Sequence, residues 1–318
     1  MGVHILGSAL RTSRAIRAVA WAVVAAGVAA PLIRRRARLP AHVVIPTAAA
    51  APIALCVAVR RSPGRDVATC VLQMWAYVAA YQIPNDDPEA LEQRVHIDYP
   101  VNVDRVLGLG LPPTLRLQRL ASPDRFTPLD KVLVWAHWVW FFVPHSSLLY
   151  VLLRHRERFP RAAVLTYAVF DLGAVVYWAV PTAPPWYAAR HGRMAVPDMP
   201  RVRRMMEEYG AEFWKENWGP LYSFLGGNPL AAMPSLHFAT SVMAAQVLTD
   251  TGAVAGAVGW TYALTLGFAL VYLGEHYLVD LLAGLTLAQG VRRLAPRAAP
   301  LLLRASRGIQ QLEARAHA

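Results

Sequence analysis

The sequence has little charge and almost no cysteine. Charged residues make up 16% of its 318 residues and hydrophobic residues 56%, and there are only two cysteines. Because Cys56 and Cys70 both lie in apolar stretches, neither a disulfide framework nor a cysteine metal cluster is indicated. The apolar residues form long runs and the mean hydropathy is positive, which is typical of a protein that crosses a membrane several times.

The charge that is present has one dominant sign. A formal net charge of +12 would suggest a nucleic-acid partner in a soluble chain. Here the arginines lie in short loops between apolar runs and in the C-terminal tail. Because retention and orientation in a membrane explain this distribution better, we expect contact with a membrane and none with nucleic acid.

The apolar runs predict an all-α, polytopic membrane bundle. A membrane-spanning helix needs roughly 20 apolar residues. We expect about six core spans and one or two further helices at the N-terminus. The runs comprise residues 18–33, 41–59, 67–83, 132–153 with a break at Pro144, 162–180, 238–248, 254–273 and a last run that begins near residue 276.

Two polar connections interrupt these runs. Residues 86–131 pair apolar residues with arginines at short spacing, which fits either a broken amphipathic segment at headgroup level or an exposed loop. Residues 181–227 combine arginines with tryptophans, a composition typical of the membrane interface.

Two histidines flank the last pair of long runs. His237 lies just before residues 238–248, and His276 lies just after residues 254–273. The first run reaches spanning length only if its helix begins near Leu230, which places His237 in the opening turns. Two spans joined by a tight turn return the chain to the face it left, so we expect both imidazoles at one membrane surface.

His276 is followed four positions later by Asp280. On a helix the two side chains would be neighbours, with Cβ atoms about 5–6 Å apart. The carboxylate would then accept from one ring nitrogen, fix the tautomer and leave the other nitrogen free to attack an electrophile. His237 follows a Pro-Ser pair that suits a helix start, where it could protonate a leaving oxygen while Ser235 and nearby amides bind a phosphate.

Each feature also has a purely structural explanation. A histidine near a helix end is commonly satisfied by local hydrogen bonds, and a His-Asp pair at helical spacing often only stabilises the fold. The combination favours function, because ionisable groups inside or bordering a bilayer are costly. For His137 and His145 we favour packing over a place in the same cavity, and we expect Asp171 to face the bundle interior.

Several motifs resemble a known family. MPSLHFA at residues 233–239 and GEHYLVDLLAG at residues 274–284 resemble the last two signature motifs of the type 2 phosphatidic acid phosphatase superfamily. They are most similar to the branch of the inositol phosphorylceramide synthases and their bacterial relatives. PTAPPW at residues 181–186 and the segment of residues 103–120 resemble further landmarks of that branch.

The resemblance implies a role for each residue of the His-x38-His-x3-Asp pattern. His276 would be the nucleophile that forms a phosphohistidine, Asp280 would orient it, and His237 would protonate the leaving group. The function implied is that of an integral-membrane lipid phosphatase or phosphotransferase acting on a phospholipid or a lipid-linked phosphate.

The chain departs from the wider superfamily in its cations. The Lys-x6-Arg-Pro motif is absent, and Ala269 and Leu270 stand where a Ser-Arg pair is expected. The groups that clamp the phosphate are therefore unassigned. Arg190 and Arg193 are candidates, because they follow PTAPPW closely and the guanidinium fork suits phosphate.

Metals and cofactors are not expected. The sequence has no acidic cluster of metal-ligand spacing near the histidines, so arginines and a helix start would supply the electrostatics. Two other classes remain as alternatives. A proton-coupled transporter would use the histidines and Asp171 as a relay, although no internal repeat supports it, and a non-catalytic membrane protein would need none of them.

Arginine distribution predicts the orientation and the domains. If the basic tail is cytoplasmic, counting spans backwards puts residues 154–161 inside and both histidines outside, in a multi-pass protein of the cell membrane. We divide the chain into N-terminal membrane helices at residues 1–66, a phosphatase-like catalytic membrane domain at 67–290 and a basic cytoplasmic tail at 291–318. The first helix is expected to be uncleaved, because arginines follow its apolar core directly.

Overall fold

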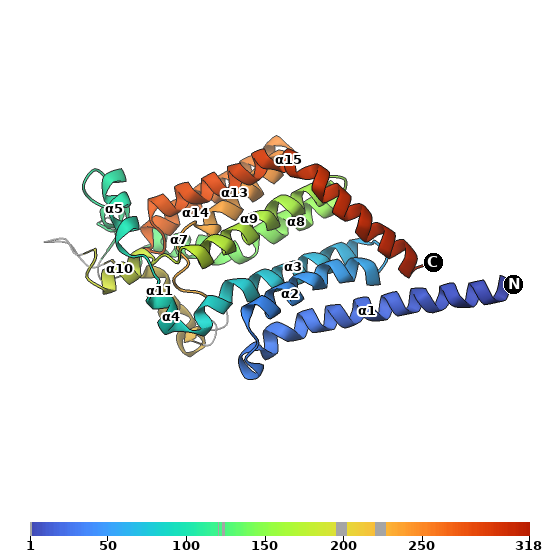
Figure 1. Cartoon of the computed structure of the whole chain (residues 1–318). Helices are drawn as coiled ribbons and strands as arrows, with labels where there is room; N and C mark the ends of the chain where they lie inside the picture. Colours follow the sequence, from blue (N-terminus) through green and yellow to red (C-terminus); the bar gives the residue numbers. More distant parts are fainter. Residues whose placement is uncertain (1, 120, 123–124, 195–201, 220–226) are drawn as a thin grey trace. The chain divides into compact units, whose positions relative to one another are not determined.

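The fold is helical throughout the part of the chain that the structure describes (Figure 1). The computed structural model describes residues 2–119, 121–122, 125–194, 202–219 and 227–318. Within these ranges extended backbone occurs only as isolated bridges, so the predicted all-α class is confirmed. Residues 195–201 and 220–226 of the predicted connection at 181–227 lie outside the described residues.

The chain divides into two compact units, Met1–Asp86 with Arg293–Ala318 and Asp87–Arg292. The functional boundaries proposed at residues 66 and 290 stay predictions. Unit 1 contains α1 (Gly2–Ala37), α2 (Ala41–Ala58), α3 (Pro63–Gln82), η1 (Ile83–Asp86) and the C-terminal part of α15 (Leu278–Ala316). Unit 2 contains α4 (Pro88–Glu92), α5 (Asp98–Leu107), α6 (Pro113–Gln118), α7 (Pro128–Trp138), η2 (Val139–Phe141), α8 (Val143–Arg154), α9 (Phe159–Ala179), α10 (Pro185–Arg190), α11 (Met205–Trp214), η3 (Lys215–Asn217), α13 (Leu236–Thr249), α14 (Ala253–Tyr272) and the first part of α15.

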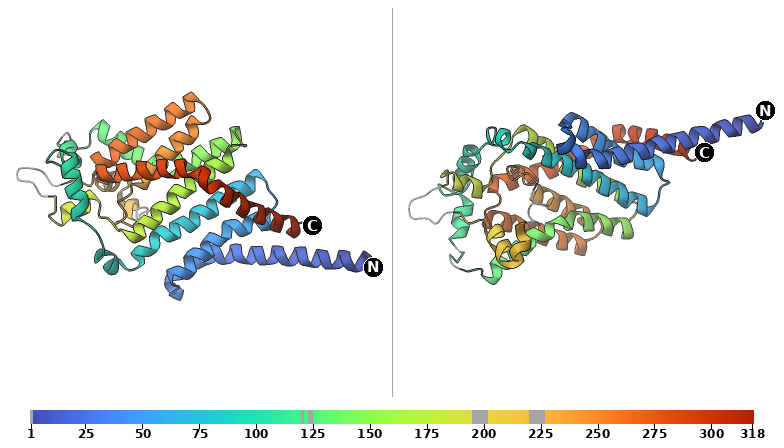
Figure 2. Two further views of the ribbon diagram at one scale, coloured as in Figure 1. Left: turned by 45° about the horizontal axis from the view of Figure 1, so that its top comes forward. Right: turned by 90° about the horizontal axis from the view of Figure 1, so that it is seen from below.

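In unit 1, the helices α1, α2 and α3 pack side by side (Figure 2). The Arg34 guanidinium lies 2.8 Å from the Asp86 carboxylate, which ties the end of α1 to η1. The predicted tail is helical up to Ala316 as part of α15, and its Glu313 pairs with the buried Arg65 of α3 at 2.9 Å. This end of α15 is therefore fixed by ion pairing within unit 1.

Four described helices are long and apolar enough to span a membrane, and the bent pair of α7–η2 and α8 could add a fifth. The pair bends by 55° at Phe142, two residues before the break predicted at Pro144, because proline is tolerated in the first turn of α8. The multi-pass membrane class agrees with these helices. The four are Thr12–Ala37 within α1, α2, α9 and α14.

Helix α13 has only 14 residues and is shorter than a spanning helix. It begins at Leu236, so the start predicted near Leu230 was wrong. Ser235 is the N-cap residue, and Pro234 directly before it cannot donate a backbone hydrogen bond.

Asp171 does not face the interior of unit 2. This residue is exposed on α9, whereas the adjacent Phe170 is fully buried. Successive residues on a helix point about 100° apart, and the buried face of α9 continues through Gly173 and Ala174. The prediction that Asp171 faces the bundle interior was wrong, and the proton relay of a transporter loses one of its proposed residues.

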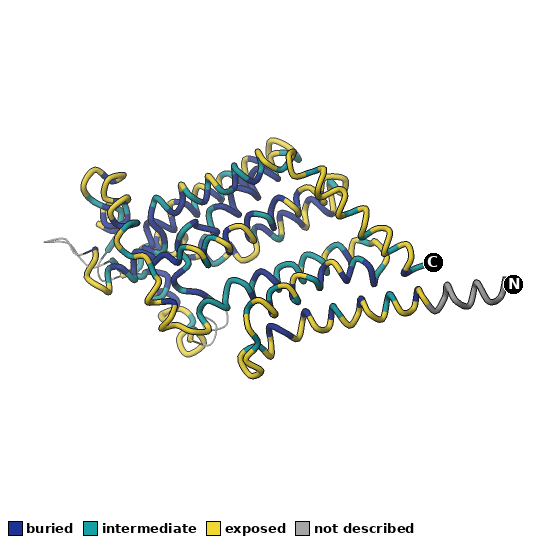
Figure 3. Tube along the Cα trace, in the orientation of Figure 1, coloured by how far each residue is buried: buried dark blue, intermediate teal, exposed yellow. Residues whose placement is uncertain are grey.

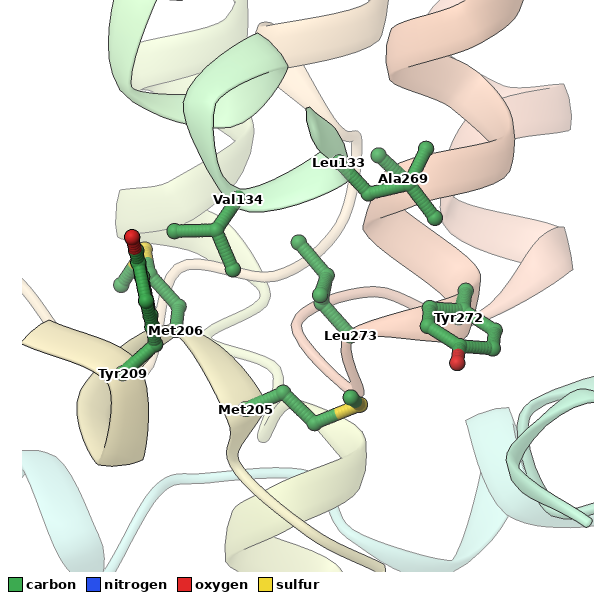
Figure 4. Packing of buried hydrophobic residues seen from close by; sticks show 8 residues of the cluster. All are labelled: Leu133, Val134, Met205, Met206, Tyr209, Ala269, Tyr272 and Leu273. Atoms are coloured by element: carbon green, nitrogen blue, oxygen red, sulfur yellow. The ribbon is translucent and has the colours of Figure 1, made fainter. Parts of the chain in front are cut away.

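A buried cluster fixes one end of the unit 2 bundle, where α5, α10 and α11 gather near the start of α13 and the end of α14 (Figures 1 and 3). The cluster joins α7, α11 and α14 (Figure 4). Burial of each large apolar side chain contributes about 1.5–3 kcal/mol. The packing therefore sets the residue before α11, Arg204, against the residues that follow α14. The cluster consists of Leu133, Val134, Met205, Met206, Tyr209, Ala269, Tyr272 and Leu273.

Candidate active site

The start of α13 places His237 at the site. His237 is the second residue of this helix, and the Ser235 hydroxyl before it accepts a hydrogen bond from the Phe238 amide at 3.4 Å. The Ser235 amide donates to the Asp280 carbonyl oxygen at 3.0 Å, which joins the start of α13 to the first turn of α15. Ser235 is fully buried. Its predicted role in binding phosphate stays a prediction.

His276 lies two residues before α15 and not on the helix. The expected contact is nevertheless present, because Asp280 in the first turn of α15 reaches back towards the helix start. One oxygen of Asp280, Oδ2, lies 3.2 Å from His276 Nδ1 and accepts from the Tyr277 amide at 2.9 Å. The His-Asp pair therefore depends on the capping geometry of a helix start.

The two histidines are in direct contact. His237 Nδ1 lies 3.2 Å from His276 Nε2. The distances fix the contacts, and the donor in each depends on the tautomer. In the tautomer of neutral His276 that carries its proton on Nδ1, beside the Asp280 acceptor, Nε2 has a lone pair and His237 Nδ1 is the donor between the two rings.

Asp104 of α5 holds the start of α15. Its two carboxylate oxygens accept from the Leu278 and Val279 amides, each at 2.9 Å. Burial raises the pKa of Asp104 to about 6, and the two amide hydrogen bonds oppose that shift. Sequence reasoning missed Asp104. The one signal was its place in the segment of residues 103–120 that resembles a family landmark.

Gly274 allows the segment before α11 to approach the chain beside His276. It has a φ of +80°, and a Cβ there would lie 2.8 Å from the Arg203 carbonyl oxygen. Gln118 of α6 secures this approach, since its Nε2 donates to the carbonyl oxygens of Arg203 and Tyr272, both at 2.9 Å. The chain before α11 is thereby held beside Glu275, the neighbour of His276.

Arg204 is the cation that this approach brings to the site. Its side chain is 10% exposed and pairs with Glu207 at 2.6 Å and with Glu275 at 3.4 Å. Its guanidinium also lies 3.9 Å from the centre of the Trp186 ring, in the PTAPPW motif. Sequence reasoning missed Arg204, because nothing in its local sequence distinguishes it from the other arginines of residues 181–227.

The two predicted clamp residues lie nearer the solvent. Arg190 is 59% exposed and pairs with Glu207 at 3.3 Å, and Arg193 is 55% exposed and pairs with Asp98 at 3.4 Å. Their role in binding phosphate stays a prediction.

The two further histidines of the α7–α8 pair differ in their surroundings. The His145 ring lies among Tyr167 and Phe170, as expected for packing. The His137 ring instead lies against His237, with ring centres 4.7 Å apart. His137 therefore contacts one of the two histidines of the candidate site, whereas packing alone was predicted.

The arrangement joins Asp280, His276 and His237 in one chain of contacts, as the predicted roles of the three residues require. The Arg204 guanidinium pairs with Glu275, the residue directly before His276. Among the described residues, no group of three or more His, Cys, Asp or Glu side chains could hold a metal ion.

Comparison with known proteins identifies the family. A family model described as the PAP2 superfamily matches residues 101–294, which is more than half of the chain. The chain belongs to the PAP2 superfamily. The resemblance found in the sequence motifs is confirmed, and the two residues that sequence reasoning missed, Asp104 and Arg204, lie within the matched region.

A curated relative supports the same branch of the PAP2 superfamily. The chain is 28% identical over 148 residues to the phosphoinositol dihydroceramide synthase of Bacteroides thetaiotaomicron, covering 42% of this chain and 45% of the relative. The match thus covers less than half the length of this relative. No solved structure matches this chain. PAP2 membership supports a phosphatase or phosphotransferase activity in general.

Proposed function

We propose that this PAP2 protein is a membrane lipid phosphatase or phosphotransferase that works through a phosphohistidine at His276. The observation that carries the proposal is the chain of contacts from Asp280 through His276 to His237, with 3.2 Å between each pair of atoms. It supplies an oriented nucleophile and an acid directly beside the attacking nitrogen.

In the first half-reaction, His276 Nε2 attacks the phosphorus of the substrate and the bond from phosphorus to the leaving oxygen breaks. The leaving oxygen takes a proton from His237, which is in its imidazolium form when the phosphate is bound and becomes a neutral imidazole, and Asp280 stabilises the charge that develops on the His276 ring. The substrate's phosphoryl group must enter where His237 now donates to His276. Both reacting nitrogens therefore face the incoming phosphorus.

In the second half-reaction, an acceptor hydroxyl attacks the phosphorus held by His276. The acceptor's proton passes to His237, the bond from phosphorus to Nε2 breaks, and both rings return to their first state. Water as acceptor gives hydrolysis, and an alcohol gives transfer. The synthase name of the Bacteroides relative supports transfer.

Arg204 is the phosphate-binding cation in this proposal. It is the buried arginine beside Glu275, whereas Arg190 and Arg193 are more than half exposed. Because its planar guanidinium can pair with two phosphate oxygens, it suits this role better than a point charge would.

The substrate is a phospholipid or a lipid-linked phosphate that reaches the site from the membrane, and the site lies on the extracytoplasmic face of the cell membrane. The apolar helices α9 and α14, which belong to the same unit as the histidines, support a lipid substrate. The arginine-rich loop of residues 154–161 supports this orientation.

Trapping of the intermediate tests the proposal. Purified protein would be incubated with phosphate-labelled phospholipid and quenched rapidly, and the label on the protein should be acid-labile and base-stable. His276→Ala should carry no label and lose essentially all turnover, and Asp280→Asn should lose much of it. Full turnover by His276→Ala would overturn the assignment, and turnover that depends on an ion gradient would favour the transporter.

His237→Ala separates the acid from the nucleophile. An activated aryl phosphoester has a leaving group that needs no proton, so this variant should recover part of the lost rate with that substrate. The His276→Ala variant should recover none. Product analysis by mass spectrometry, with and without inositol or another alcohol, decides between hydrolysis and transfer.

A further inference from the structure

A third histidine shares the site with His237 and His276. His137 is the penultimate residue of α7, and it lies outside both histidine motifs. The residue is buried, with 4% of its surface exposed. The ring centres of His137 and His237 are 4.7 Å apart, with an angle of 34° between the ring planes.

The position of the His137 ring is set by its neighbours in the chain. Trp140, one turn later, places its own ring 4.2 Å from that of His237 and donates from Nε1 to the Thr240 hydroxyl at 2.9 Å. Before His137, the Ala136 carbonyl oxygen accepts from the Tyr262 hydroxyl of α14 at 3.0 Å. The end of α7 is thus joined to α13 and α14 on either side of His137.

One ring nitrogen of His137 has no hydrogen-bond partner. Its Nδ1 is buried and unpaired in a part of the chain that the structure describes. A buried nitrogen without a partner has lost its hydrogen bonds to water and has gained none within the protein. Such atoms are rare in folded proteins and call for an explanation. A ligand that enters beside His237 would supply the missing partner.

We propose that His137 is a further substrate-binding residue, which donates a hydrogen bond from Nδ1 to an oxygen of the substrate's phosphate group. This inference rests on the proposed function. Phosphate oxygens act as acceptors here, so the ring must be the donor. A second donor is needed because Arg204 already shares its charge with Glu207 and Glu275. His137 binds the charge that builds up on the phosphoryl oxygens while His276 attacks.

Two substitutions of His137 test the proposal, because one keeps an aromatic ring without the donor nitrogen and the other keeps a donor nitrogen without the ring. His137→Phe keeps an aromatic ring against His237 and removes the donor, so kcat/KM should fall roughly tenfold or more. His137→Asn places an amide nitrogen close to the position of Nδ1 and should restore part of the loss. His145→Phe is the matched control from the same bent pair, and it should leave kcat/KM near the wild-type value.

Orthovanadate provides a readout that does not require turnover. Its binding, followed by the shift in melting temperature, should be weakened in His137→Phe, and less so in His137→Asn. Wild-type kcat/KM and vanadate binding in His137→Phe would overturn the inference. The inference would also be overturned if kcat/KM and vanadate binding were lower in His137→Asn than in His137→Phe. That pattern would mean that only the packing of the ring matters. A wild-type protein that binds vanadate but turns over no phospholipid would contradict the proposed function and leave the His137 test in place.

Discussion

The guanidinium of Arg204 lies 3.4 Å from the carboxylate of Glu275, the residue directly before His276. Burial raises the pKa of Glu275, and the charge of Arg204 opposes that shift. The two side chains are only 10% and 11% exposed, so solvent screens their charges little. A cation is therefore fixed next to the chain segment of His276, the proposed nucleophile, although the superfamily's usual basic motifs are absent from the sequence.

Replacement of Arg204 should weaken phosphate binding. Charge-assisted hydrogen bonds contribute about 1.5–3 kcal/mol each, so Arg204→Ala should lower kcat/KM roughly ten- to a hundredfold. Arg204→Lys should restore only part of the activity, because lysine lacks the planar fork. Steady-state kinetics with a phospholipid substrate measure both effects.

Two kinds of control accompany Arg204→Ala. Glu207→Gln removes the 2.6 Å ion pair but keeps the arginine, and it shows how much of the loss comes from local packing. Arg190→Ala and Arg193→Ala should cost less than Arg204→Ala, since both guanidinium groups are more than half exposed. If kcat/KM fell only in Arg190→Ala or Arg193→Ala, the phosphate-binding cation would be one of the two arginines predicted from the sequence.

Asp104 should make stability depend on pH. Its pKa is about 6 in the folded protein against an ordinary value of 3.8, because burial disfavours the charged form. A raised pKa in the folded state contributes stability below pH 3.8, and that stability is lost as the pH rises through about 6. The melting temperature of the wild type should therefore fall relative to that of Asp104→Asn over this range.

Thermal unfolding of detergent-solubilised protein at a series of pH values measures this difference. Asp104→Asn cannot ionise, so it provides the pH-independent reference. A wild-type melting temperature that rises relative to the variant between these pH values would mean that the two amide hydrogen bonds outweigh burial, and the raised pKa would be wrong.

Sequence patterns predicted which residues meet at the candidate site better than they predicted the helix boundaries around it. The His-x38-His-x3-Asp pattern identified the three residues that the structure brings together, because residues at adjacent helix ends meet whatever the exact helix boundaries are. The helix boundaries themselves were less accurate. His276 precedes α15, and α13 begins six residues after Leu230, because capping by Ser235 outweighs the continuity of the apolar run.

Residues held by tertiary contacts could not be predicted in this way. Arg204 differs from its neighbours only because Gly274 and Gln118 hold its segment against the end of α14. Asp104 acts on α15 across a long sequence separation, through backbone amides that carry no side-chain signature. His137 was assigned to packing, because its contact with His237 depends on how α7 and α13 pack.

Cysteine labelling tests the proposed orientation. In a background of Cys56→Ser and Cys70→Ser, we would introduce Glu216→Cys near the histidine end of unit 2 and Arg156→Cys in the loop between α8 and α9. Both positions are exposed. In intact cells a membrane-impermeant thiol reagent should label Glu216→Cys and leave Arg156→Cys unlabelled until the membrane is permeabilised. The reverse pattern would place the active site on the cytoplasmic face.

Gly284 of α15 tests whether the contact between the two histidines depends on close helix packing. A Cβ at Gly284 would lie 2.6 Å from the Ser235 carbonyl oxygen, which belongs to the backbone directly before α13 and cannot rotate away. Gly284→Ala should therefore push the start of α13 from α15 and lengthen the 3.2 Å contact between His237 and His276. Because misplacement by about 1 Å can cost a hundredfold, kcat should fall by at least about tenfold.

Gly290 is the matched control for this prediction, because it lies on the same helix and a Cβ there would meet nothing within 4 Å. Gly290→Ala should keep full activity and gain up to about 1 kcal/mol from the better helix propensity of alanine.

The phosphohistidine label separates attack by His276 from protonation by His237 in Gly284→Ala. His276 and Asp280 both belong to the α15 side of the contact, so label should still form from an activated aryl phosphoester while turnover of phospholipid is reduced. Equal activity of the two alanine variants would show that α13 can move without separating the histidines, and the site would then tolerate a looser arrangement than the structure indicates.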